Sequence, residues 1–471
     1  KDIREPKLVL RVNGGGQTSD MTQPDPANLS QAFVFDGVNS AECSVYSYSY
    51  KGRALRIQEA TRAGWKTSNN TFWTLSAGSL AIPTDNATSG QLVYCDSNTT
   101  ATCRIIDMLD FWCDYGSVFE DSGDIYLKNH EGGSRGASGL EFRGCYSVWI
   151  DMFGKGDESS EPRVDLMRFV NSPVTSNKCY NINIQTAFCV AGNVGIYAEN
   201  IGDGDENGLH IGMLHSRLNT DCGVKLVNCE GATVGIDSRQ DGSGVKLEGT
   251  TKRATVNGEI QLSVNEGVQV TSTAGKDSYL TGLTVRNCNI TSSAPTAAGR
   301  GQIKIETTLP FTLRDCVIET VLHLSDYLID TVASNNVRIF GGRMSQSAGG
   351  VSNFKNTPNA VSNVKDSNNN NLLLSSIELE VNVPITGTAV MQGFTDVTPS
   401  RLMTTGAFGL GGSSGVVISD LDDQSLPSGL YNCVNGTTLN NTIDGISFSG
   451  SVLVTNRAAS ARVTQLLMTE G

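Results

Sequence analysis

A short phrase that recurs in the central third of the chain presents side chains suited to acid–base chemistry on a charged substrate. It reads GIYA at 195, GVKL at 223, GVKL at 244 and GQIKI at 301. Because side chains alternate along a strand, the aliphatic residues share one face and the middle residue points the other way. The predicted exposed column consists of Glu141, Tyr197, Lys225, Lys246, Gln269 and Lys304.

Lysines and a tyrosine in one column provide the groups that β-elimination of an acidic polysaccharide requires. An ammonium stabilises the negative charge that develops on a uronate carboxylate. A lysine, histidine or tyrosine with a shifted pKa removes the C5 proton and protonates the leaving oxygen. We therefore expect Lys225 or Lys246 to neutralise the carboxylate. Tyr197 or His210 is expected to act as base and acid, with Glu206 between them.

A salt-bridge ladder is the alternative interpretation of the same column. Glu199, Glu230 and Glu248 lie close enough in sequence to pair with its lysines. Rungs of a β-solenoid are about 4.8 Å apart, and like charges at that range repel unless an anion or carboxylates compensate them. The sequence alone leaves the ladder and the anion-binding groove both open.

Acidic clusters offer a second chemistry, glycoside hydrolysis, which needs two carboxylates about 5 Å apart for retention or about 6.5–9.5 Å apart for inversion. Candidates lie at 151–158, 203–206 and 237–241. The cluster at 203–206 also resembles the opening of an EF-hand calcium loop. Such a loop needs a Glu at position 12, which is Leu214 here, and the flanking segments are strand-like instead of helical. Solvated turns have the same composition, so we assign no metal and no cofactor.

Five further side chains are predicted to contact the substrate. Trp149 falls at an outward position, where it stacks on a sugar ring or packs against a neighbouring subunit. His130 and Arg135 lie in a Gly-rich segment that borders the groove or simply turns the chain. The predicted substrate-binding residues are Glu199, Arg239, Trp149, His130 and Arg135.

Composition excludes several classes of protein. The 471 residues carry a net charge of -13, which argues against a nucleic-acid partner. No run approaches the roughly 20 apolar residues of a membrane span, so no membrane insertion is expected. The 12 cysteines form no CxxC pair and sit in apolar segments, which favours buried free thiols and folding in a reducing cytosol. Because the chain begins at Lys1, we expect a fragment or a processed form.

The recurring phrase predicts an all-β solenoid. Repeats of 20–35 residues made of short alternating strands and polar turns bury their inner face only by stacking on one another. We expect a right-handed, single-stranded parallel β-helix with a small C-terminal β module. The predicted organisation is irregular strands at 1–130, the β-helix at 131–395, a linker at 396–415 and the module at 416–471.

A parallel β-helix of this size followed by a small β module resembles bacteriophage tailspikes. The tail segment, with DLDDQSLPSGLYNC and GSVLVTNRAASARVTQLLM, is similar to the knob-like repeat of phage tail fibres. The resemblance implies a homotrimeric polysaccharide depolymerase with a pectate-lyase-like β-helix. It also implies a place in the virion tail, assembly in the host cytoplasm, and contact with other tail proteins through a missing N-terminal part. Many tailspikes open with a GDGxxDD segment, which this sequence lacks.

The expected function is to bind and cleave a bacterial capsular polysaccharide, a uronate-containing, heparosan-like glycan, by β-elimination. The lysines of the predicted exposed column make the chain similar to coliphage lyases that act on heparosan-type capsules. One alternative is an endo-glycosidase of capsule or O-antigen that uses paired carboxylates. A non-catalytic glycan-binding fibre or adhesin, and a secreted enzyme of the pectate-lyase type, also stay open.

Overall fold

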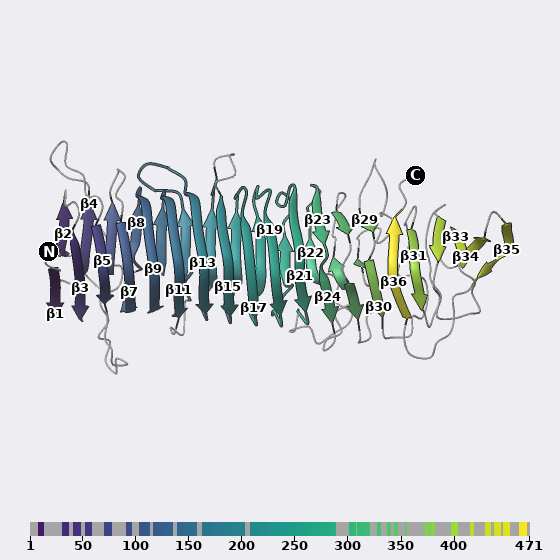
Figure 1. Ribbon diagram of the computed structural model, residues 1–471, viewed down its shortest axis with the longest axis horizontal. Coiled ribbons are helices and arrows are strands. Elements are labelled where there is room, and N and C mark those ends of the chain that lie inside the picture. Colours follow the sequence, from purple (N-terminus) through teal and green to yellow (C-terminus); the bar gives the residue numbers. More distant parts are fainter. Residues whose placement is uncertain are drawn as a thin grey trace, which may run out of the picture. The chain divides into compact units, whose positions relative to one another are not determined.

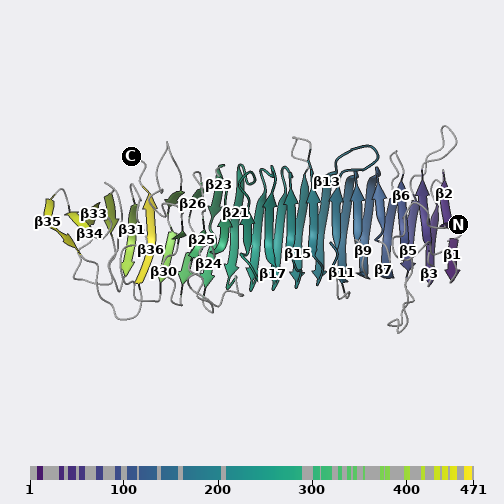
Figure 2. The same ribbon diagram turned by 180° about the vertical axis from the view of Figure 1, so that it is seen from behind.

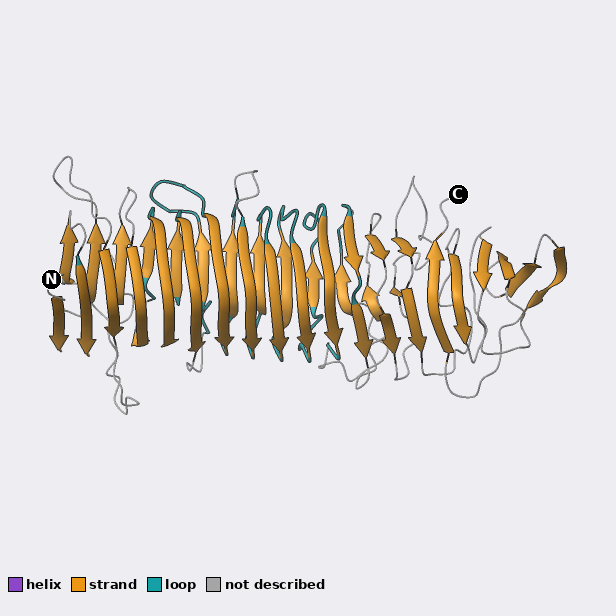
Figure 3. Cartoon of the chain, in the orientation of Figure 1, coloured by secondary structure: helices purple, strands orange, loops and turns teal. Residues whose placement is uncertain are grey.

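The computed structural model consists of strands and turns, with no helix in the part of the chain that it describes (Figure 3). Within that part, no helix is therefore long and apolar enough to span a membrane. The described residues are 8–13, 31–36, 41–48, 52–58, 70–77, 91–96, 103–113, 116–134, 139–157, 163–202, 208–288, 301–307, 309–320, 327–330, 337–340, 343–346, 354–355, 372–375, 377–381, 397–403, 415–418, 429–434, 438–443, 446–452 and 461–468.

The chain divides into two compact units, Lys1–Asp237 and Ser238–Gly471, here called unit 1 and unit 2. In unit 1, alternate strands belong to two parallel sheets (Figure 1). Sheet A contains β1 (Leu8–Asn13), β3 (Glu42–Tyr48), β5 (Asn70–Ala77), β7 (Cys103–Cys113), β9 (Gly123–Ser134), β11 (Tyr146–Asp157), β13 (Tyr180–Val190) and β15 (Leu209–Arg217). Sheet B contains β2 (Gln31–Asp36), β4 (Arg53–Gln58), β6 (Gln91–Asp96), β8 (Val118–Glu120), β10 (Leu140–Arg143), β12 (Met167–Val170), β14 (Val194–Glu199) and β16 (Cys222–Val227).

This alternation is the topology of a parallel β-helix, and the predicted fold class is confirmed. Each strand of one sheet is followed by a strand of the other, and pairing joins each strand to the one two places along the chain. In sheet B, for example, β12 pairs in parallel with β14, and β14 with β16. Seen from the opposite side in Figure 2, unit 1 has the same succession of rungs.

Apolar residues at alternate positions build the core between the sheets. In β14, Ile196 and Ala198 are fully buried, whereas Tyr197 between them is only partly covered. Phe119, Phe142 and Phe169 stack on successive rungs, with ring centres 5.3 and 5.0 Å apart. Burial of each such ring contributes about 1.5–3 kcal/mol, so the ladder holds the outward side chains in register.

Parallel pairing begins well before the recurring phrase becomes visible. The first segment was predicted to hold irregular strands leading into the β-helix, and its described strands β1 to β9 pair in parallel, with register shifts between β3 and β5 and between β7 and β9. The cysteines from Cys43 to Cys316 are all buried and free, as expected for small apolar core residues. Burial raises the pKa of the Cys43, Cys179 and Cys229 thiols to about 12, so these thiols are protonated and unreactive at neutral pH.

Unit 2 continues as parallel strands and ends in antiparallel ones. Its first sheet contains β19 (Thr255–Gln261), β21 (Ser278–Arg286), β23 (Phe311–Arg314), β24 (Val317–Thr320), β26 (Val337–Phe340), β27 (Arg343–Gln346), β29 (Leu372–Ser375) and β30 (Ile377–Val381). Its second contains β18 (Ser243–Glu248), β20 (Val268–Val270), β22 (Gly301–Ile305), β25 (Tyr327–Asp330) and β28 (Phe354–Lys355). The remaining strand, β17 (Thr233–Arg239), contains the division between the units.

The C-terminal part of unit 2 has its own antiparallel sheet. It is formed by β32 (Gly415–Ile418), β33 (Gly429–Val434), β34 (Thr438–Ile443) and β35 (Ile446–Val452). The last strand, β36 (Ala461–Met468), pairs antiparallel with β30 and with β31 (Val397–Met403). Strand β31 lies in the segment predicted to be a linker, and β36 joins the preceding strands instead of the four-stranded sheet.

Candidate functional site

The predicted column is present in unit 1 as a row of register partners on the outer face of sheet B. The Cα partner of Glu141 is Arg168, that of Arg168 is Tyr197, and that of Tyr197 is Lys225. Tyr197 and Lys225 therefore occupy the same position on consecutive rungs, as the alternation in GIYA and GVKL predicts. We call Arg168, Tyr197 and Lys225 the basic column.

The later members of the predicted column belong to unit 2. Lys246 is the Cα partner of Gln269, and Gln269 is the partner of Lys304. The Lys304 ammonium forms an ion pair with Glu306. The regular alternation of GVKL, GVQV and GQIKI thus places these three side chains in one row, as expected.

Tyr197 is enclosed by charged neighbours that keep its hydroxyl protonated. The hydroxyl donates a hydrogen bond to Glu199 Oε2 at 3.0 Å, and the Arg168 guanidinium lies 5.3 Å from the ring centre. Burial and, next, the Glu199 carboxylate raise the pKa of Tyr197 to about 12, against the opposing effect of Arg168 and Lys225. At neutral pH this side chain is therefore a proton donor.

The basic column also forms ion pairs within the protein. Lys225 Nζ lies 3.4 Å from Asp221 Oδ2, just before its own strand, and Arg168 Nε lies 3.5 Å from Asp165 Oδ2. These two aspartates, at the strand entrances, were not among the glutamates expected to form a salt-bridge ladder. Both ion pairs are partly exposed, so each contributes little to stability and is open to competition by another anion.

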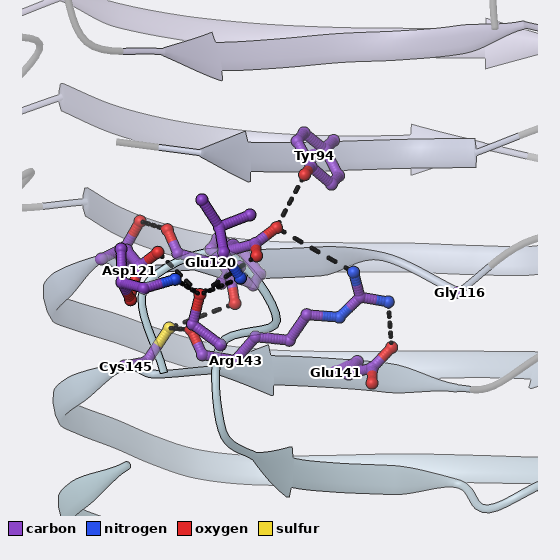
Figure 4. Close-up of polar contacts among 12 residues, drawn as sticks. Tyr94, Gly116, Glu120, Asp121, Glu141, Arg143 and Cys145 are labelled. Atoms are coloured by element: carbon purple, nitrogen blue, oxygen red, sulfur yellow. Dashed lines mark hydrogen bonds and ion pairs between the residues drawn. The ribbon is translucent and has the colours of Figure 1, made fainter. Parts of the chain in front are cut away.

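Glu141 of the predicted column also belongs to a carboxylate network with Glu120, Arg143 and Tyr94, which the sequence analysis missed (Figure 4). Arg143 Nη2 lies 2.9 Å from Glu141 Oε2, and Arg143 Nη1 lies 3.9 Å from Glu120 Oε2. Tyr94 donates its hydroxyl hydrogen to Glu120 Oε2 at 2.7 Å. Less than a tenth of either glutamate side chain is exposed, so two carboxylates flank one guanidinium in a nearly closed site.

Glu141 connects this network to the basic column. Its other oxygen, Oε1, lies 3.4 Å from Arg168 Nη1, and Arg168 in turn covers the Tyr197 ring. Burial alone would lower the pKa of Arg143, but Glu141 and then Glu120 outweigh it and raise this pKa. Arg143 therefore stays charged. The contacts from Glu120 through Arg143, Glu141 and Arg168 to Tyr197 form within the protein itself, without a substrate.

The turn after β12 fixes Glu120 from the other side. The buried hydroxyl oxygen of Ser172 lies 2.8 Å from Asp121 Oδ2 and 3.2 Å from Glu120 Oε1. Asn177 donates to Asp121 Oδ1 at 3.0 Å, and Thr175 donates to the same atom. Asp121 has a left-handed backbone, with φ of 46°, which this set of hydrogen bonds stabilises.

The sequence contains a signal for one of the missed residues. Arg168 is the fourth residue of DLMRF at 165–169, where it lies between the apolar residues Met167 and Phe169, so the same alternation would have identified it. Glu120, Arg143 and Tyr94 lie in YGSVFED, EFRGC and QLVYCD. Arg143 and Glu120 are two positions beyond the column, at the ends of their strands, where the repeat offers no guide.

Two predicted site residues lie on the outer face of sheet A instead of sheet B. Trp149 of β11 is the register partner of Asn183, and Asn183 is the partner of His210 on β15. His210 is therefore on a different sheet from Tyr197, and the two do not form one acid–base pair. Arg239 lies at the end of β17, in unit 2. Glu206, Arg135 and the Asp203–Asp205 turn lie outside the described residues.

His130 is buried inside unit 1. Its register partners Met108 and Phe153 are both core residues, and its ring stacks on Phe153 with centres 4.6 Å apart. His130 Nε2 lies 3.0 Å from Asp110 Oδ1, and Lys155 Nζ lies 2.9 Å from Asp110 Oδ2. The structure therefore places His130 in a buried triad with Asp110 and Lys155, and not at a groove.

Gly132 makes room for this triad. It is the register partner of both Asp110 and Lys155, and a Cβ at this position would come within 1.9 Å of Asp110 Oδ1. We expect Gly132→Ala to lower the free energy of unfolding by about 1–3 kcal/mol, as for other overpacked cores. Urea unfolding tests this. Gly133→Ala, where the nearest atom to the added Cβ lies 3.8 Å away, is the matched control for the loss of a glycine without a steric clash.

Of the three predicted carboxylate clusters, the structure describes the side chains of Asp151, Asp237 and Asp241, and each has a different partner. The members at 157–158 and 203–206 lie outside the residues whose side chains are described. Asp151 accepts a hydrogen bond from the Tyr126 hydroxyl on sheet A. Asp237 lies 3.1 Å from His215 Nδ1, whereas Asp241 is buried and accepts from Ser238 at 2.6 Å. Among the described residues, no group of three or more His, Cys, Asp or Glu side chains is arranged to hold a metal ion.

Comparison with known proteins adds no relative. No family model matches the chain, and a search of curated proteins finds no match. The functional interpretation therefore depends on the residues of the site itself.

Proposed function

We propose that the chain binds an acidic polysaccharide along the outer face of sheet B in unit 1 and cleaves it by β-elimination. The observation that supports this most is the basic column, in which a tyrosine lies between two cations on consecutive rungs. The rungs are about 4.8 Å apart, so a bound chain would meet these groups in succession. A uronate-containing capsular glycan, such as a heparosan-like polymer, has the required carboxylates.

The two cations suit neutralisation of the uronate carboxylate. Arg168 and Lys225 are each about one-fifth to one-third exposed, and each is paired with an aspartate at the strand entrance. A substrate carboxylate would exchange with Asp165 or Asp221 at these partly exposed pairs. The neutralised carboxylate stabilises the charge that develops when the neighbouring C5 proton leaves.

Tyr197 is the proposed base and acid, because His210 lies on the other sheet. In its ionised form the Tyr197 oxygen takes the C5 proton, and the electrons of the C5–H bond form the C4–C5 double bond. The C4–O4 bond breaks, and O4 keeps the electron pair of that bond and receives the proton from Tyr197. The products are an unsaturated uronate end and a new reducing end, and tyrosinate is regenerated.

The wider setting that we propose is a bacteriophage tailspike. In this setting the chain forms a homotrimer in the virion tail and meets the capsule of the host bacterium. The parallel β-helix and the antiparallel C-terminal strands are compatible with that role.

Product analysis tests the proposed reaction. Wild-type protein is incubated with heparosan and other uronate-containing capsular polysaccharides, and chain length is followed by size-exclusion chromatography. We expect shorter chains together with ultraviolet absorbance from the unsaturated uronate. Lys225→Ala is expected to lower the rate about 100-fold or more, while Lys178→Ala, at an exposed lysine away from the column, retains it.

Hydrolysis is the second candidate, and one specific observation favours it: Glu120 and Glu141 flank Arg143 in a nearly closed site. Two such carboxylates suit the acid and base of a glycosidase. If hydrolysis occurs, new reducing ends appear without ultraviolet absorbance, and Glu120→Gln or Glu141→Gln abolishes them while Lys225→Ala has little effect. Binding without shortening of the polysaccharide would instead indicate an adhesin.

A further inference from the structure

The outer face of sheet A in unit 1 carries a second group of side chains that the proposed cleavage does not use. Trp149 is 47% exposed at the middle of this face. Its register partners on the two neighbouring rungs are Tyr126 and Asn183. An exposed indole between a phenol and an amide differs from the charged ladder on sheet B.

Paired polar side chains lie on the strand of Trp149 and on the two preceding strands of sheet A. Tyr126 donates its hydroxyl hydrogen to the Asp151 carboxylate, two residues after Trp149 on β11. One column further along the strands, Asn129 Nδ2 donates to Asp107 Oδ1 at 2.9 Å. These contacts orient two carboxylates while leaving lone pairs that accept hydrogen bonds from a ligand.

We propose that this face binds an uncharged, hydroxyl-rich oligosaccharide, with Trp149 as the stacking platform and with Asp107 and Asp151 as acceptors for its hydroxyl groups. The site is independent of the proposed cleavage and would hold a glycan chain while sheet B acts on another segment or another polymer. The apolar face of a pyranose ring covers an indole, and its hydroxyl groups meet the carboxylates at the edge.

The two carboxylates favour a saccharide over a second copy of the chain at this surface. Covering Asp107 and Asp151 with an apolar protein surface would remove water from two carboxylates without replacing its hydrogen bonds, which is unfavourable. A polyol replaces those hydrogen bonds directly. An uncharged ligand is favoured over an ionic one because Arg104, which lies 5.3 Å from the Tyr126 ring centre, and the exposed Lys128 of β9 compensate the charges of Asp107 and Asp151.

The test measures binding of dextran, mannan, galactan and chitin oligosaccharides by calorimetry, with tryptophan fluorescence as a second signal. We expect at least one of these neutral glycans to bind the wild-type chain. Trp149→Ala is expected to weaken that binding about 10-fold or more, and Trp149→Phe less than Trp149→Ala. Asp151→Asn is expected to weaken binding because it replaces one acceptor oxygen.

The controls separate this site from the cleavage site and from folding. Tyr197→Phe is expected to leave neutral-glycan binding unchanged. Trp73→Ala, which removes another partly exposed tryptophan of sheet A, is the matched control and is expected to leave this binding unchanged as well. Circular dichroism checks that each variant is folded. The proposal is overturned if none of the four glycans binds, or if Trp149→Ala binds them as the wild type does. A change of oligomeric state on sedimentation of Trp149→Ala, with glycan binding intact, would assign the face to self-association.

Discussion

Asp110→Ala is expected to lower the free energy of unfolding of the chain by about 3–5 kcal/mol, the range for breaking a buried ion pair. Asp110 is completely buried, and it contacts Lys155 at 2.9 Å and His130 at 3.0 Å. Without its carboxylate, the Lys155 ammonium would remain inside unit 1 with no opposite charge. Urea unfolding followed by circular dichroism measures the loss.

A double variant distinguishes loss of a charge partner from loss of packing. Asp110→Asn with Lys155→Met removes both charges, and it should recover most of the stability lost in Asp110→Asn alone. If the double variant is no more stable than Asp110→Asn, the Asp110–Lys155 pairing does not account for the effect.

The same aspartate predicts how stability depends on pH. Burial alone would raise the pKa of Asp110, but Lys155 and then His130 outweigh it, so this pKa lies below its ordinary value. Its contribution is therefore complete above the unfolded-state pKa, which is about 3.9, and is lost as pH falls through the lower folded-state pKa. Urea midpoints between pH 6 and pH 2.5, roughly the window of carboxylate titration, should fall more for wild type than for the uncharged double variant.

The recurrence of GVKL and its relatives was sufficient to predict the β-helix because side-chain alternation and rung stacking are local rules. The same rules placed Tyr197 and Lys225 in one row. They also apply to β1 through β9, but there the recurring phrase is hidden, so these strands were expected to be irregular, and the pairings of β3 with β5 and of β7 with β9 do contain register shifts. Stacking of Phe119 on Phe142 shows that these rungs use the same core.

The residues that come together at the site were harder to predict, because their grouping depends on which sheet each strand joins. His210 is close to Tyr197 in sequence, yet it begins the next strand of the other sheet. His130 was expected at a groove, but the register with Met108 and Phe153 turns it inward. Glu120 and Arg143 come together from neighbouring rungs at strand ends, where the length of each turn decides the alignment.

Tyr197→Phe is expected to lower kcat/KM for polysaccharide cleavage about 10³-fold, within the range for loss of an acid–base group. The phenyl ring still covers the core and faces Arg168, so the variant should fold as the wild type does. If Tyr197→Phe retains full activity, Tyr197 is not the catalytic base.

Glu199→Gln tests the same assignment through the pH profile. The pKa of Tyr197 is about 12 because burial and the Glu199 carboxylate both favour the neutral phenol. If tyrosinate is the base, the rate rises with pH up to that value. Replacing the carboxylate by an amide of the same shape removes the part of the shift due to Glu199, so the pKa of Tyr197 falls and the alkaline limb moves to lower pH.

At a fixed pH below both pKa values, the Glu199→Gln variant should therefore cleave faster than the wild type, by about tenfold for each unit that the pKa falls. Lys225→Gln has the opposite effect on this pKa, because Lys225 lowers it. The alkaline limb of Lys225→Gln should then lie at higher pH, in addition to its lower maximal rate. If the alkaline limbs of the two variants move in the same direction, or if neither limb moves, the result contradicts proton transfer by Tyr197.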